Sequence, residues 1–308
     1  MRKKIRKKRR KLTLYLIGIF IGTFILSYKG YECYHNKIVQ ANKEVTASKV
    51  VSTNKAKESD IKIETKENMI VNRSHNINDE GQKYTYDVKR VKDILDNKEE
   101  SDGKKIAFLT FDDGPSTTVT PKILDVLKEH NVKATFFLIG KSINSNEASK
   151  NLVKRTFREG HALGNHTYSH NLKSLYPENK INVDCFVEEV VKTNAAIKNI
   201  IGQDFDTRVL RMPGGYMSRE HYKDPNLAEL NNRLRDMYSI DWNAYDFDSE
   251  GKKKNAEELL KEVKKSVGTK EKVVILMHDA YGKEETAKAL PQIIKYLRDQ
   301  GYEFKTLS

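Results

Sequence analysis

The chain has 308 residues and a formal net charge of +13 at pH 7. Such a charge would suggest a nucleic-acid partner if it were spread along the chain. Nine of the lysines and arginines, however, lie within residues 2–11, which leaves +4 for all that follows. The sequence therefore predicts no nucleic-acid role. With two cysteines, the chain is also not a disulfide-stabilised scaffold.

The basic segment 1–11 is followed by an apolar run at residues 12–28, with Tyr15 and Tyr28 near its ends. The run has 17 residues, the short end of what spans about 30 Å of hydrocarbon. Positive charge stays on the cytoplasmic side, so we expect a single-pass anchor in the cell membrane with residues 1–11 inside. A cleaved signal peptide is the alternative, although residues 27–35 contain no convincing small-x-small site.

Residues 29–103 are predicted to form an extracellular tether. They are rich in Lys, Asn, Glu and Ser. Within residues 81–100, Tyr84, Val88, Val91 and Leu95 recur at helical spacing. This pattern predicts a short amphipathic helix, which either docks on the following domain or belongs to a stalk.

From residue 104 to residue 308, strand-like runs alternate with amphipathic helical ones. We expect strands at 105–111, 134–140, 161–165, 209–213, 237–242, 273–278 and 302–308. Helices are expected at 120–130, 183–200, 226–236, 255–267 and 284–299. Repeated strand-helix units predict the α/β class, with a parallel sheet covered by helices, and about seven of them suggest a closed or nearly closed barrel.

A carboxylate and two histidines form a candidate metal site. Asp113 lies in TFDDGPS at 110–116, and His166 and His170 lie in GNHTYSH at 164–170. A catalytic zinc ion takes three such ligands and leaves a fourth position to water. A pair of solvated loop histidines is the alternative for the second segment alone. We expect one divalent metal ion, with Zn²⁺ ahead of Co²⁺, Mn²⁺ and Ni²⁺.

Two further side chains are candidates for acid and base. Asp112 stands beside Asp113, and His278 ends the apolar run at 273–278. Metal-assisted hydrolysis needs one group that activates water and another that protonates the leaving group. Most of these candidates follow predicted strands, at the end where barrel enzymes carry their sites.

At these motifs the chain resembles the polysaccharide deacetylases of carbohydrate esterase family four, over roughly residues 104–308. TFDDGP, the histidine pair, Arg211 with Pro213, the pair Asp241-Trp242, and Leu276 with His278 occur in the order of that family's five motifs. The resemblance implies a deformed (β/α) barrel, Asp112 as base, Asp113, His166 and His170 as metal ligands, and Arg211 as the residue that orients the base. One departure is that Gly214 and Gly215 follow Pro213 where many members have an aromatic residue.

The same resemblance suggests roles for the remaining residues. The backbone N–H of Gly214 is expected to help hold the oxyanion, and His278 to act as the acid with Asp241 as its orienting carboxylate. Trp242 and Leu276 are expected to line the acetyl pocket, and Tyr216 to contact substrate as the first aromatic residue after Pro213.

The implied function is metal-dependent N-deacetylation of N-acetylglucosamine in peptidoglycan, by a catalytic domain outside the cell. Two alternatives stay open. One is a deacetylase of another N- or O-acetylated polysaccharide, such as an exopolysaccharide, a chitin-like polymer or xylan. The other is a catalytically silent wall-binding protein on the same fold.

Overall fold

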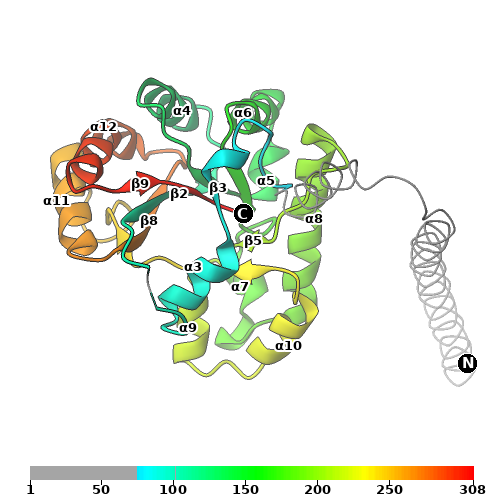
Figure 1. Ribbon diagram of the computed structural model, residues 1–308. Coiled ribbons are helices and arrows are strands. Elements are labelled where there is room, and N and C mark those ends of the chain that lie inside the picture. The colour runs from blue at the N-terminus through cyan, green and yellow to red at the C-terminus, as the bar shows by residue number, and fades with distance from the viewer. Residues whose placement is uncertain (1–74, 101) are drawn as a thin grey trace, which may run out of the picture. The chain divides into compact units, whose positions relative to one another are not determined.

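The computed structural model describes residues 75–100 and 102–308, which belong to one compact unit (Figure 1). The predicted basic segment 1–11, the predicted anchor 12–28 and most of the predicted tether lie outside these residues. Among the helices of the described part, none is both long and apolar enough to cross a membrane.

A curled parallel sheet forms the centre of the fold, with strand order β6-β5-β4-β3-β2-β8-β7. The strands span Ile106–Gly114 (β2), Thr135–Leu138 (β3), Ala162–Asn165 (β4), Val209–Leu210 (β5), Tyr238–Ser239 (β6), Ala244–Tyr245 (β7) and Lys272–His278 (β8). All of them were predicted except β7. The arrangement is a half-barrel, consistent with the deformed barrel that the resemblance implied.

The two edge strands, β6 and β7, are consecutive in the chain. Only residues 240–243 connect them, so the two edges lie no more than about 18 Å apart. The opening of the half-barrel therefore lies between these two strands.

The two faces of the sheet follow from the two-residue period of a strand. On β2, Ala107, Leu109 and Phe111 point outward into a core shared with the helices. Ile106 and Phe108 point inward, into a separate apolar cluster. Both faces are buried, as expected of a parallel sheet covered by helices.

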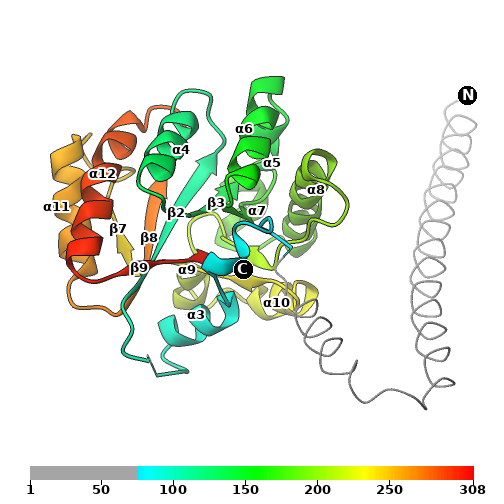
Figure 2. The same ribbon diagram turned by 45° about the horizontal axis from the view of Figure 1, so that its top comes forward.

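Helices cover the outer face, and Figures 1 and 2 show the longest of them in an arc around the sheet. Local sequence signals determine where several helices begin, and one of them is the capping box between Asn255 and Glu258. The five predicted helices are present. They are α4 (Thr120–Glu129), α8 (Val183–Ile201), α10 (Leu227–Arg233), α11 (Ala256–Val267) and α12 (Glu284–Asp299). The structure adds α5 (Gly140–Ile143), α6 (Glu147–Arg158), α7 (Leu172–Leu175) and α9 (Tyr216–His221).

The first described residues pack against the last ones. The predicted strand at 302–308 divides into β9 (Glu303–Phe304), which pairs with β2, and β10 (Thr306–Leu307), which pairs with β1 (Thr85–Tyr86). Helix α3 (Val88–Leu95) follows β1, and Val88 and Val91 are fully buried. Of the two alternatives for residues 81–100, the structure therefore has the docked helix.

Candidate active site

The candidate residues gather at the carboxyl end of the sheet. Asp112 and Asp113 lie near the end of β2, and His278 is the last residue of β8. His166 and Arg211 directly follow β4 and β5. Asp112 and His278 are paired in register on adjacent strands, so the expected base and acid share one face of the sheet.

Asp113, His166 and His170 converge as the sequence predicted. Asp113 Oδ1 lies 3.4 Å from His166 Nε2 and 3.5 Å from His170 Nε2. The three ligand atoms all lie within 4.8 Å of one another. Asp113 Oδ1 is buried and has no hydrogen-bond partner. A divalent cation would satisfy this orphaned oxygen, so the donor set fits a metal site.

The backbone at this cluster is unusual. Asp113, Thr167 and His170 have φ values of 72°, 63° and 52°, in the left-handed region that few residues other than glycine adopt. Such conformations cost free energy and persist where the surroundings impose them. Here they turn two of the three candidate ligands toward a common point.

Hydrogen bonds fix the two histidines. His166 Nδ1 lies 2.7 Å from the carbonyl oxygen of Arg211, which leaves Nε2 to face Asp113. The loop that carries His170 is held by Asn165 Oδ1, which accepts from Thr167 N at 2.9 Å, and by Glu189, which accepts from Ser169 N at 3.0 Å. Burial lowers the pKa of His166, but the carboxylates of Asp112 and Asp113 outweigh it and raise that pKa overall.

Arg211 positions Asp112. Its guanidinium is fully buried and donates to Asp112 Oδ1 at 2.9 Å and to Thr110 Oγ1 at 2.7 Å. Its other donors reach the carbonyl oxygens of Ile240 and Asp241 at 3.0 and 3.2 Å. The ring of Phe137 lies 4.1 Å from the guanidinium carbon. The expected orienting role of this arginine is thus matched by a direct contact.

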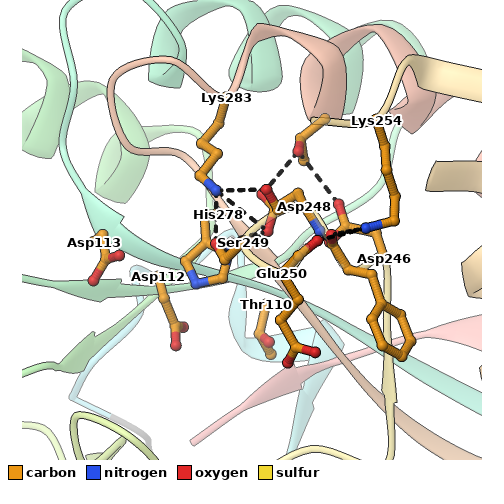
Figure 3. Close-up of polar contacts among 12 residues, drawn as sticks. Thr110, Asp112, Asp113, Asp246, Asp248, Ser249, Glu250, Lys254, His278 and Lys283 are labelled. Carbon is orange, nitrogen blue, oxygen red and sulfur yellow. Dashed lines mark hydrogen bonds and ion pairs between the residues drawn. The ribbon is translucent and has the colours of Figure 1, made fainter. Parts of the chain in front are cut away.

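The carboxylate that holds His278 is Asp248, and this corrects the expected partner, Asp241. Asp248 Oδ1 lies 2.6 Å from His278 Nδ1 (Figure 3). Asp248 follows β7, which pairs with β8, whereas Asp241 follows β6 at the opposite edge of the sheet. Burial lowers the pKa of His278, but the hydrogen bond and charge of Asp248 raise it to about 9.

Asp241 has a different task. Its oxygens accept from the backbone N–H groups of Tyr216 at 2.8 Å and Met217 at 2.6 Å, at the start of α9. Tyr216 and Trp242 line a cavity beside it, together with Lys92 of α3. Leu276 is not among the residues that line this cavity, so the structure does not bring Trp242 and Leu276 together there.

Gly214 has a φ of 80°, a conformation that suits glycine, and its carbonyl oxygen accepts from Ser218 Oγ at 2.7 Å.

The sequence prediction missed Asp248 and Lys283. Lys283 Nζ donates to the carbonyl oxygen of Asp248 at 2.8 Å and to Ser249 Oγ at 2.6 Å. Asp248 was missed because it follows β7, a strand that the sequence analysis did not predict.

A half-barrel whose strand ends carry a candidate base, a candidate acid and an Asp-His-His cluster is the arrangement expected of a hydrolase. Comparison with known proteins agrees. Residues 99–232 match the polysaccharide deacetylase family. A peptidoglycan-N-acetylglucosamine deacetylase of Bacillus cereus is 35% identical over 208 residues, which cover 66% of this chain and 69% of that protein.

Two further relatives cover similar parts of the chain. A bifunctional xylanase/deacetylase of Pseudobutyrivibrio xylanivorans is 36% identical over 205 residues, which cover 67% of this chain and 30% of that protein. The structure of a Streptococcus mutans CE4 esterase has a TM-score of 0.66 and 38% identity, and the match covers 76% of this chain and 96% of that one. The chain belongs to the polysaccharide deacetylases of carbohydrate esterase family four.

Proposed function

We propose that the protein is a metal-dependent hydrolase that removes the N-acetyl group from N-acetylglucosamine residues of peptidoglycan. The observation that carries the proposal is the pairing of Asp112 and His278 in register on adjacent strands, beside the Asp113-His166-His170 cluster. The name of the Bacillus cereus relative supports the choice of peptidoglycan.

Asp113, His166 and His170 would hold the divalent ion, which when bound polarises the acetyl carbonyl and acidifies water. Asp112, held by Arg211, takes the proton of the attacking water. The Gly214 N–H contributes to holding the oxyanion. His278 Nε2 donates a proton to the departing amine nitrogen while Asp248 holds its Nδ1.

Zinc is the proposed ion, because two imidazoles and one carboxylate form a common catalytic zinc ligand set. Stripping the protein with a chelator should abolish acetate release, and zinc should restore it. His166→Ala and His170→Ala should lower metal occupancy and activity together, with an unchanged circular dichroism spectrum. His221→Ala, an exposed histidine, is the matched control. Full activity in metal-free protein would contradict the proposal.

The substrate is tested by measuring acetate released from purified peptidoglycan, chitin oligomers and acetylated xylan, with Asp112→Asn as the inactive control. We expect peptidoglycan to be preferred. Deletion of the protein should also lower the proportion of deacetylated glucosamine in muropeptides and raise lysozyme sensitivity. Preference for acetylated xylan would support the alternative substrate class suggested by the xylanase/deacetylase relative.

We further propose that residues 12–28 anchor the protein in the cell membrane and that the catalytic domain lies outside. The supporting observations are the nine basic residues within 2–11 and the apolar run after them. This placement would bring the site to newly made wall.

A further inference from the structure

Two buried carboxyl groups lie behind His278. Asp246 is 1% exposed, and the side chain of Asp248 is 5% exposed. Both approach the same hydroxyl group, that of Thr286 on α12. Thr286 Oγ1 lies 3.3 Å from Asp246 Oδ2 and 3.0 Å from Asp248 Oδ2.

A hydroxyl group carries one hydrogen, so Thr286 can donate to only one of these two oxygens. The second contact is favourable only if the other carboxyl group is protonated and donates to Thr286. Asp248 is held ionised, because its Oδ1 lies 2.6 Å from His278 Nδ1 and 3.7 Å from Lys283 Nζ. Within residues 75–100 and 102–308, Asp246 forms no ion pair, and its Oδ1 accepts from Asp248 N at 3.1 Å.

The surroundings favour a neutral Asp246. Burial, with the charge of Asp248 as the next cause, raises the pKa of Asp246 to about 7. The charged groups around the pair are His278 at the end of β8, Lys283 before α12, and Lys254 before α11. Lys254 Nζ contacts the carbonyl oxygens of Phe247 and Glu250 at 2.9 and 2.7 Å, not the Asp246 carboxyl group.

We propose that Asp246 is a protonated positioning residue at the end of a chain of hydrogen bonds. Asp246 donates to Thr286, Thr286 donates to Asp248, and Asp248 accepts from His278. The chain fixes the carboxylate that orients the acid. Loss of the Asp246 proton would leave two carboxylates facing one hydroxyl hydrogen, so the chain would break. Only the effect of this chain of hydrogen bonds on turnover rests on the proposed function. The protonation of Asp246 does not depend on it.

Infrared difference spectroscopy of the full-length protein across neutral pH tests the protonation. We expect a carbonyl band of a protonated carboxyl group that disappears in Asp246→Asn, a variant of the same size. Asp279 is also buried, which raises its pKa to about 7, so Asp279→Asn assigns the second band expected there. An identical spectrum for wild type and Asp246→Asn would overturn the proposal, whatever the substrate.

Two substitutions at Thr286 test the positioning. Thr286→Ser keeps the hydroxyl group, and Thr286→Val keeps the shape without it. We expect Thr286→Val to lower kcat about ten-fold with little change in KM, the effect of one lost hydrogen bond to a charged group. It should also shift the His278 pKa measured by NMR, which needs no substrate. Thr286→Ser should resemble wild type, and equal losses in the two variants would refute the chain.

Discussion

Arg211 is the residue on which the geometry of the base depends. It is a fully buried cation that contacts Asp112, itself 3% exposed. A buried ion pair stabilises little by comparison with an apolar pair, but removal of one partner leaves an uncompensated charge. The pair therefore matters more for where Asp112 points than for how stable the fold is.

Arg211→Met should lower the free energy of unfolding by about 3–5 kcal/mol, because the carboxylate of Asp112 loses its buried cation. The double variant Arg211→Met with Asp112→Asn should recover part of that loss, because no buried charge remains. Chemical denaturation of the two single variants and the double variant measures this coupling. Strictly additive losses would show that the two side chains do not interact.

His278 is predicted to act as an acid, so it must carry its proton. Its pKa is raised from 6.5 to about 9, and activity should therefore fall as the pH rises above about 9. Asp248→Asn removes the negative charge beside His278, so the fall should begin at lower pH. A pH profile of kcat for both proteins checks this, and an unmoved alkaline limb in the variant would contradict the pairing.

The raised pKa of His278 also affects the stability of the fold. A histidine whose pKa is higher in the folded state than in the unfolded state stabilises the fold fully below its unfolded value. The contribution of His278 is therefore present below about pH 6.5 and is lost as the pH rises through about 9.

At the scale of elements, α3 is the helix whose position matters most. Its buried valines lie in the apolar cluster inside the sheet, with Phe108 and Val274. The backbone N–H of Val88 donates to the carbonyl oxygen of Ser308 at 2.9 Å, and Asn76 Nδ2 donates to that of Leu307 at 3.0 Å. A catalytic unit that began after this segment would lose part of its core.

A chain that begins at residue 75 should therefore be more stable than one that begins at residue 100. Within the full chain, Val91→Asp should lower the free energy of unfolding by about 3 kcal/mol or more, because it buries an unpaired charge. Lys89→Asp introduces the same side chain at an exposed position of α3 and should change stability little. Thermal unfolding measures all four proteins, and equal stability of the two truncated chains would show that α3 is dispensable.

Much of the fold follows from local pattern, because long apolar runs such as β2 and β8 and amphipathic helices such as α11 carry their own signals. The candidate metal ligands and Asp112 were also predictable, since Asp112, Asp113 and His166 follow predicted strands and His170 lies four residues after His166. The carboxylate that contacts His278 was not predictable. Its identity depends on where the sheet opens, because the chain crosses from one edge to the other between Ser239 and Ala244. No local pattern in the sequence shows at which edge of the sheet Asp241 and Asp248 will lie.

At the scale of the whole molecule, the predicted orientation in the membrane can be tested directly. Protease added to intact protoplasts should release the catalytic domain, because the basic residues before residue 12 are expected to stay inside. A cytoplasmic marker protein should remain intact in the same sample. Complete protection of the domain until the membrane is lysed would refute the proposed orientation.

The pairing of β1 with β10 also has a consequence for when the protein can fold. Thr85 pairs with Thr306, so a contact on which α3 depends joins residues more than 200 positions apart. Ribosomes make the amino-terminal partner first, and distant pairings form slowly. In a nascent chain that lacks its last strand, Val88 and Val91 lack part of the packing that buries them. The packing of β1 and α3 on the domain should therefore be completed only after synthesis has passed Thr306 and Leu307.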